Sequence, residues 1–128
     1  MRMILLLAVA GAAGTLSRYG LGGLTQRITG AGFPYGTLVI NTLGCLMIGY
    51  VMQIALNTDI IPVNARVVVT IGFLGAFTTF STFSYETVRL FEDGAWVSAI
   101  LNIMMNVGLG LAATLLGVLL GRITLRGV

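Results

Sequence analysis

A cluster of phenyl and hydroxyl side chains lies in the middle of a long apolar part of the chain. Phe77, Phe80 and Phe83 recur every three residues, so on a continuous helix they would lie near one face. The hydroxyl residues around them are Thr78, Thr79, Ser81, Thr82 and Ser84. A helix that only spans lipid needs no such alternation, since Leu, Ile, Val and Ala suffice. The pattern therefore favours a polar and aromatic pathway inside a membrane.

These side chains favour an anion as the ion on that pathway. Hydroxyl and amide groups donate hydrogen bonds, and a phenyl ring has a positive edge. A small, strongly hydrated anion needs such donors to replace its water. A cation pathway usually needs acidic side chains or carbonyl oxygens, and Glu86 is the one acid near a membrane segment. The residues do not name the anion.

The backbone before the cluster contains Gly72 and Gly75. Irregular backbone at membrane depth is tolerated only where protein buries it or where it lines a cavity. We therefore expect a helix that is weakened or broken between Gly75 and Thr79, followed by a helix that carries the pathway.

The composition places the whole chain in a membrane. Of its 128 residues, 57% are hydrophobic and 9% are charged, whereas about a quarter of a soluble domain is charged. The chain has no His and one Cys, so imidazole catalysis, a disulfide framework and a Cys-based metal site are excluded. The net charge of +3 comes from scattered Arg, which does not favour nucleic-acid binding. We therefore expect that the chain is not an enzyme.

Four segments are long enough to span a bilayer, which takes about 20 apolar residues per helix. They lie at about 3–24, 37–56, 67–90 and 96–120, and predict an all-α membrane protein with one transmembrane channel domain over residues 1–128. The first ten residues resemble a secretory signal. However, the apolar run continues to about Leu24, so we interpret it as the first span rather than a cleaved leader.

Polar residues within the first two spans each allow two interpretations. Arg18 either extends to the far interface or lies at the mouth of a water-filled vestibule, where it attracts anions. Asn41 either joins helices by hydrogen bonds or presents its N–H donors to an anion.

The last two spans raise similar alternatives. Glu86 either forms an i,i+3 pair with Arg89 at the helix end or lies as a carboxylate at the pore entrance. Asn102 and Asn106 share one face of the fourth span, and Thr114 follows two turns later. Further along, Gly117-x-x-x-Gly121 is a small-residue motif that supports helix packing and nothing more.

The arginines give the chain only a weak orientation in the membrane. Arg2, Arg66, Arg122 and Arg126 fall on the side of the termini, Arg27 and Arg89 on the other, with Arg18 closer to the latter. A bias this slight is compatible with insertion in both directions. A four-helix chain of this length also has too little interior to enclose a pathway alone. Both points favour a homodimer, with an antiparallel arrangement among the possibilities.

Three segments resemble signatures of the Fluc (CrcB) fluoride channel family, and the resemblance covers essentially the whole chain. They are the Gly-rich Arg-Tyr segment Gly11–Tyr19, the Asn-Gly segment Gly36–Gly44 and the third-span segment Gly72–Phe83. The resemblance implies an antiparallel, dual-topology homodimer in the bilayer of the bacterial cytoplasmic membrane. It implies two pores, each lined by both subunits, that passively export fluoride and so relieve fluoride toxicity.

The resemblance also implies roles for individual residues. Phe80 and Phe83 would contact fluoride through their ring edges, and Asn41 would line the pore. The hydroxyl track would consist of Ser81, Thr82 and Ser84, and Arg18 would lie in the vestibule, where we also place Glu86. The backbone carbonyls of Gly75 and Thr78 would bind a structural sodium ion at the dimer interface. Some family members have Tyr and Ser where this chain has Asn102, Asn106 and Gly110.

Two other functions are compatible with four short spans. A small dual-topology multidrug exporter needs a membrane-buried Glu in its first helix, and this chain has Arg18 there instead. A non-transporting scaffold held together by glycine faces would leave the phenyl and hydroxyl alternation unexplained.

Overall fold

The computed structural model describes residues 1–127, which form helices and turns and no strand. The elements are α1 (Arg2–Thr29), α2 (Tyr35–Asn57), α3 (Val63–Val67), the π-helix η1 (Val68–Leu74), α4 (Gly75–Phe77), α5 (Phe80–Glu92) and α6 (Trp96–Arg126). Four units are long and apolar enough to cross a membrane, and α3 to α5 together make the third. The prediction of a multi-pass, all-α membrane protein with a broken third span is therefore confirmed.

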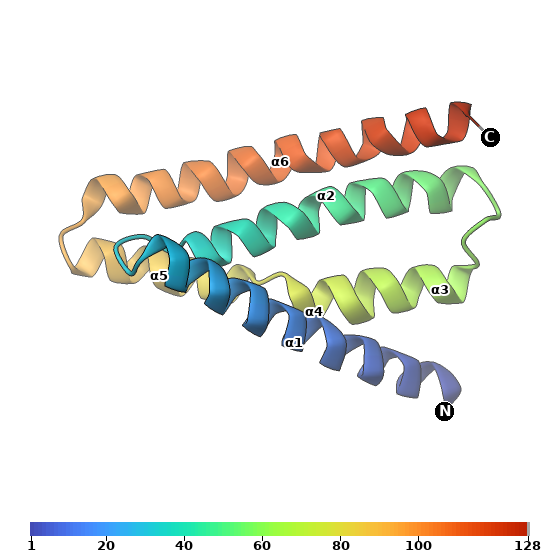
Figure 1. Ribbon diagram of the computed structural model, residues 1–128, viewed down its shortest axis with the longest axis horizontal. Helices are drawn as coiled ribbons and strands as arrows, with labels where there is room; N and C mark the ends of the chain where they lie inside the picture. The colour runs from blue at the N-terminus through green and yellow to red at the C-terminus, as the bar shows by residue number, and fades with distance from the viewer. Residues whose placement is uncertain (128) are drawn as a thin grey trace.

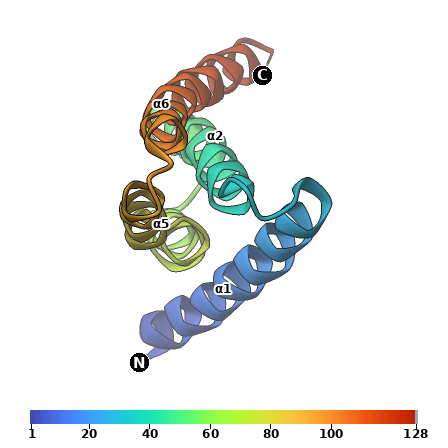
Figure 2. The same ribbon diagram turned by 90° about the vertical axis from the view of Figure 1, so that its left-hand side faces the viewer.

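The four units run alternately up and down, so both termini lie at the same end of the molecule (Figure 1). α2 and α6 lie side by side along most of their length, whereas α1 packs on η1, α4 and α2. Figure 2 shows that α1 leans away from α6. The helices therefore form an open arrangement rather than a closed bundle, and the broken span is accessible from one side.

The α2–α6 pair is close because glycines face backbone atoms of the opposite helix. A Cβ added to Gly49 would lie 2.3 Å from the carbonyl oxygen of Thr114, and one added to Gly117 would lie 2.2 Å from that of Leu46. Gly121, one turn after Gly117, faces the side chain of Gln53. The packing role predicted for the Gly117-x-x-x-Gly121 motif is confirmed.

The connections between helices are short and held by specific hydrogen bonds. Gly94 has a φ of 74°, and Ala95 N–H bonds Leu90 O at 2.8 Å in a Schellman-type end to α5. In the α1–α2 connection, the side chain of Gln26 bonds Phe33 O at 2.9 Å and accepts from Gly36 N–H at 3.1 Å. In these two connections, hydrogen bonds thus hold neighbouring spans together.

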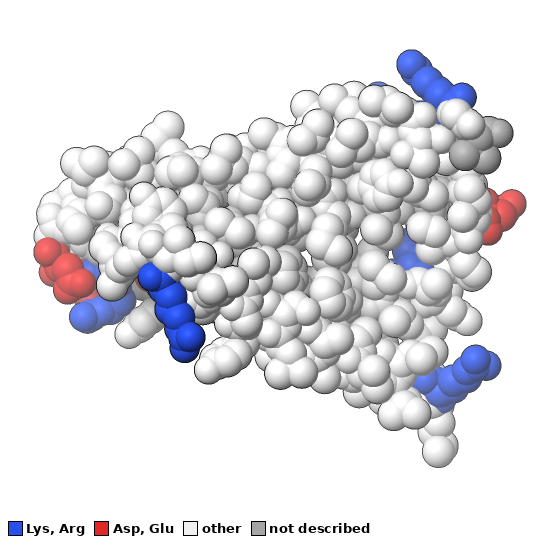
Figure 3. Space-filling view, viewed as in Figure 1, with Lys and Arg blue, Asp and Glu red and all other residues white. Residues whose placement is uncertain are grey.

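Few side chains are buried within one chain. The largest fully buried one is an amide, Asn102, which is 0% exposed, while many Leu, Ile and Val side chains along the helices are exposed. Charged side chains lie toward the two ends of the molecule and leave the middle of this face uncharged (Figure 3). This surface suits hydrocarbon surroundings or a second apolar partner.

The helices extend beyond the predicted spans. α1 continues to Thr29 and α6 to Arg126, and the third unit begins at Val63. Hydropathy locates only the part of a helix that lies in hydrocarbon, and polar turns at the interface continue the helix beyond it.

Candidate functional site

The third span breaks at Thr78 and Thr79. Both residues have extended backbone, with φ and ψ of −84° and 161° at Thr78 and −152° and 113° at Thr79. Gly75 itself is helical, with φ −62° and ψ −33°. The break therefore lies at the C-terminal edge of the predicted interval, and the glycine precedes it by one turn.

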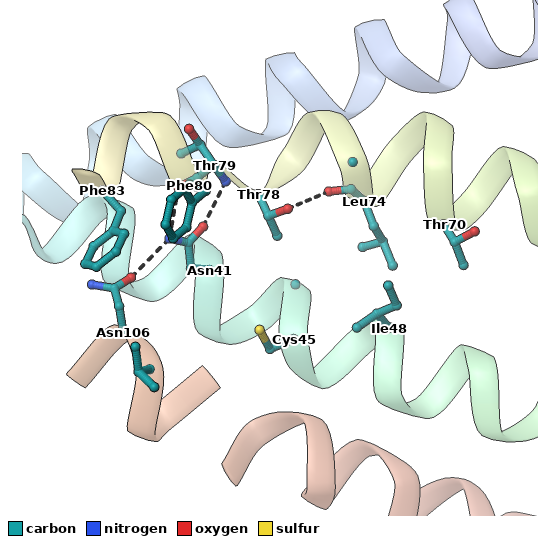
Figure 4. A pocket seen from close by; sticks show the side chains of 13 residues that line it. Asn41, Cys45, Ile48, Thr70, Leu74, Thr78, Thr79, Phe80, Phe83 and Asn106 are labelled. Atoms are coloured by element: carbon teal, nitrogen blue, oxygen red, sulfur yellow. Dashed lines mark hydrogen bonds between the residues drawn. The ribbon is translucent and has the colours of Figure 1, made fainter. Parts of the chain in front are cut away.

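Asn41 on α2 binds both backbone groups of Thr79. Its Oδ1 accepts from Thr79 N–H at 2.9 Å, and its Nδ2 donates to Thr79 O at 3.2 Å. Figure 4 shows this amide facing the break, with a further bond from Asn41 Nδ2 to Asn106 Oδ1 at 3.0 Å. Hydrocarbon offers no water to backbone groups, so a side-chain amide is what makes the break tolerable. Both N–H groups of the Asn41 side-chain amide therefore already donate to protein oxygens.

Thr79 also begins the next helix. Its Oγ1 accepts from Thr82 N–H at 3.2 Å, which is the bond of an N-cap residue, and it lies 2.9 Å from Thr82 Oγ1. Thr79 is buried and was not among the site residues predicted from the sequence. The preference of Thr for N-cap positions is the signal that could have identified it.

These two side chains release two backbone carbonyls. In a regular helix Gly75 O would accept from Thr79 N–H, and Thr78 O from Thr82 N–H. Asn41 takes the first of these donors and Thr79 Oγ1 takes the second. The carbonyls of Gly75 and Thr78 are thus separated from their usual donors, and these are the two carbonyls that the sequence analysis associated with sodium.

The break also separates the phenylalanines. Phe77 is buried and stacks on Phe73 with centroids 5.7 Å apart, whereas Phe80 pairs with Phe83 at 5.5 Å and an interplanar angle of 60°. Thr78 and Thr79 leave the helix between Phe77 and Phe80, so the single face that a continuous helix would give all three residues is not formed. Phe83 is 8% exposed, whereas Phe80 is 78% exposed.

A cavity of about 360 Å³ lies beside the break. It collects five of the predicted site residues, namely Asn41, Gly75, Thr78, Phe80 and Phe83. Asn106, Thr79, Thr70 and Cys45 also line it, and none of these four was predicted as a site residue (Figure 4). The spacing of Asn102 and Asn106 on one helix face was the available signal for Asn106.

The three hydroxyl residues of the predicted track lie next to this cavity rather than on its wall. Ser81 and Thr82 are exposed, and Ser81 Oγ lies 3.4 Å from Thr79 Oγ1. Ser84 is partly buried on α5. In the single chain these hydroxyls therefore extend from the break along α5.

Glu86 lines a second cavity, of about 370 Å³, at the end of α5. Its Oε1 accepts from Thr37 Oγ1 at 2.8 Å, and its buried Oε2 has no partner among the described residues. Arg89 instead pairs with Glu92 at 2.9 Å and with Asp93 at 3.7 Å. The predicted alternative of a Glu86–Arg89 pair is therefore wrong. Arg18 is partly buried and lines neither cavity.

Comparison with known proteins identifies the family. The family model described as CrcB-like protein, Camphor Resistance (CrcB), matches residues 5–118. The chain belongs to this CrcB family.

Relatives within the CrcB family are similar over nearly their whole length. A "Fluoride-specific ion channel FluC" of Dehalococcoides mccartyi is 50% identical over 118 residues, covering 92% of this chain and 91% of the relative. One of Geobacter metallireducens is 48% identical over 122 residues, covering 95% and 98%. One of Syntrophotalea carbinolica is 46% identical over 116 residues, covering 91% and 94%. The names of these three relatives describe them as ion channels.

Proposed function

We propose that this chain is a fluoride-specific channel that lets fluoride leave the cell passively and so relieves fluoride toxicity. The CrcB relatives that are named fluoride channels support fluoride as the ion that is conducted. The observation that carries the proposal for this chain is the cavity at the break of the third span. There Phe80 and Phe83 meet the amide side chains of Asn41 from α2 and Asn106 from α6. A channel needs no catalytic group, and we propose no enzymatic activity.

The cavity supplies the kinds of contact that a dehydrated fluoride needs. Phe80 and Phe83 both line the cavity, and a phenyl ring carries partial positive charge at its edge. Ser81, Thr82 and Ser84 continue the row of hydroxyl donors along α5. Asn41 takes part only when fluoride competes with Thr79 O or Asn106 Oδ1 for one of its N–H groups, since both are already bonded.

Both vestibule residues lie toward the end of the molecule that is opposite the termini, Arg18 in the second half of α1 and Glu86 on α5. Glu86 lies at the second cavity with one carboxylate oxygen unpaired among the described residues, and Arg18 lies on α1 outside both cavities. In this proposal Arg18 raises the local concentration of anions at that end, and Glu86 keeps the same end of the polar route hydrated.

The channel is proposed to be an antiparallel homodimer. Phe80 is 78% exposed in one chain, and its cavity is open on that side. If the exposed Phe80 faced lipid, the pathway would have no protein wall on that side. A second copy inserted in the opposite direction would cover this side, in agreement with the weak Arg bias.

A structural sodium ion fits the released carbonyls of Gly75 and Thr78. Sodium is a hard cation that binds oxygen ligands, and unwound membrane helices provide carbonyls of this kind. The diversion of Thr79 N–H and Thr82 N–H to side chains leaves these two oxygens available. When bound at the dimer interface, the ion would supply positive charge that holds carbonyls of two chains together.

Ion efflux from liposomes tests the proposal. Protein reconstituted in liposomes should release fluoride, measured with an ion-selective electrode, and retain chloride. Phe80→Ala and Phe83→Ala should each slow fluoride release. Phe91→Ala is the matched control, because Phe91 packs on Trp96 at the end of α5, away from the cavity. Comparable chloride release would contradict fluoride selectivity, and no ion release would favour a scaffold.

Sodium and the dimer are tested separately. Exchange of sodium for potassium on both sides of the liposome membrane should slow fluoride release, and crosslinking should trap dimers of opposite orientation. Unchanged release and unchanged thermal unfolding without sodium would contradict the sodium site while leaving the fluoride channel intact.

A further inference from the structure

The amide that closes the helix break is the first member of a longer chain of side-chain hydrogen bonds. Asn106 Nδ2 donates to Asn102 Oδ1 at 2.9 Å and to Asn102 O at 3.1 Å. Asn102 Nδ2 donates to Thr87 Oγ1 at 2.9 Å, and Thr87 Oγ1 donates to Phe83 O at 2.7 Å. The chain leaves the third span at Thr79, crosses α2 and α6, and returns to the third span at Phe83.

Backbone groups at both ends fix the direction of this chain. Phe83 O can only accept, so Thr87 must donate to it and can accept from Asn102. Asn102 must then present its nitrogen to Thr87 and its oxygen to Asn106. Asn106 in turn presents its nitrogen to Asn102 and its oxygen to Asn41. At the other end Thr79 N–H can only donate, which requires Asn41 Oδ1 opposite it. The backbone groups at both ends therefore require the same orientation of the Asn41, Asn106 and Asn102 amides.

Asn41 pairs with Thr79 as one residue of a β-ladder pairs with another. An extended residue offers its N–H and its C=O on one side, and a planar side-chain amide has one donor and one acceptor to match them. Rotated by half a turn about its last side-chain bond, the same amide would bring donor to donor and acceptor to acceptor. The bond to Asn106 therefore selects the orientation in which Asn41 holds the break.

Burial separates this role from contact with an ion. Asn102 is 0% exposed and does not line the cavity, and Thr87 is also buried. Neither can touch an ion in that cavity. Their influence on the break passes through Asn106 and Asn41.

We propose that Asn102 and Asn106 are positioning residues, which act through Asn41 to keep Thr79 extended and the Gly75 carbonyl free. The effect on conduction rests on the proposed channel function, whereas the effect on the backbone does not. A polar link this deep in an apolar helix pair has no water to replace it. Its loss should therefore disturb Thr79 even when no ion is present.

Solid-state NMR of the full chain in liposomes, in sodium and without fluoride, tests this directly. Asn102→Leu and Asn106→Leu preserve side-chain size and remove the link, and both should lose the Cα and Cβ chemical shifts of an extended Thr79. Thr114→Val is the matched control on the same helix, because its hydroxyl bonds only its own helix at Gly110 O. Asn106 is only partly buried, so its variant provides the test if Asn102→Leu does not fold.

Fluoride release by the same liposomes separates the two proposals. Each Asn variant should be about tenfold slower than Thr114→Val. Unchanged Thr79 shifts in the Asn variants overturn the positioning role, even if fluoride release falls. Moved Thr79 shifts in a protein whose unaltered form releases no fluoride support the positioning role and refute the channel.

Discussion

A methyl group added to Gly44 tests the approach of α2 to the helix break. A Cβ at this position would lie 2.1 Å from Thr78 Cγ2, whereas ordinary carbon contacts begin at 3.4 Å. The two carbons must therefore separate by at least about 1 Å. Thr78 cannot simply turn away, because its N–H and its Oγ1 both bond Leu74 O at 3.0 Å.

Gly108→Ala is the matched control, since nothing lies within 4 Å of the added Cβ. Both substitutions gain about 1 kcal/mol of helix propensity. Overpacking costs about 1–3 kcal/mol, so Gly44→Ala should be less stable than Gly108→Ala by that amount. Thermal unfolding of the purified protein measures the difference, and fluoride release should fall as well, because Thr78 is displaced at the break.

Thr78→Ser provides a rescue for Gly44→Ala. Serine keeps the hydroxyl that bonds Leu74 and removes the obstructing methyl, so the nearest neighbours of the new Cβ become Phe77 Cδ1 at 3.5 Å and Cβ of residue 78 at 3.6 Å. The double variant should unfold at nearly the temperature of Thr78→Ser alone. If Gly44→Ala were as stable as Gly108→Ala, or if the serine restored nothing, the contact between α2 and the break would be refuted.

Further predictions concern stability at the two cavities and the first connection. Phe83→Ala should lower the free energy of unfolding by about 3–5 kcal/mol because Phe83 is buried, whereas Phe80→Ala, at an exposed position, should lower it less. Equal losses in thermal unfolding would refute this difference in burial. Thr37→Val should lower the free energy of unfolding by about 1–3 kcal/mol because Glu86 loses its donor, and Glu86→Gln in that background should recover part of the loss. If the two substitutions acted independently, Thr37 and Glu86 would not be in contact. Gln26→Ala should lower the free energy of unfolding by a similar amount and raise hydrogen exchange in the α1–α2 connection. Unchanged exchange would show that the Gln26 hydrogen bonds do not hold this connection.

Local patterns in the sequence determined the spans and the position of the break. Hydropathy over about 20 residues depends only on neighbouring side chains, so four spans follow without knowledge of their packing. The run from Gly75 to Thr79 weakens a helix through residue types alone, and Thr79 has the side chain of an N-cap. The close-packing motif at Gly117 is likewise readable along one helix.

Only the tertiary structure decided which partner each polar side chain takes. Asn41 could equally have joined helices or faced an ion, and its bonds to Thr79 and Asn106 connect residues 38 and 65 positions apart. Glu86 has Arg89 one turn away on the same helix, yet it accepts from Thr37 on α2. Periodicity places a side chain on a helix face, but the partner depends on how helices distant in sequence approach and rotate. The break itself separates Phe77 from Phe80 and Phe83, which no helical repeat can express.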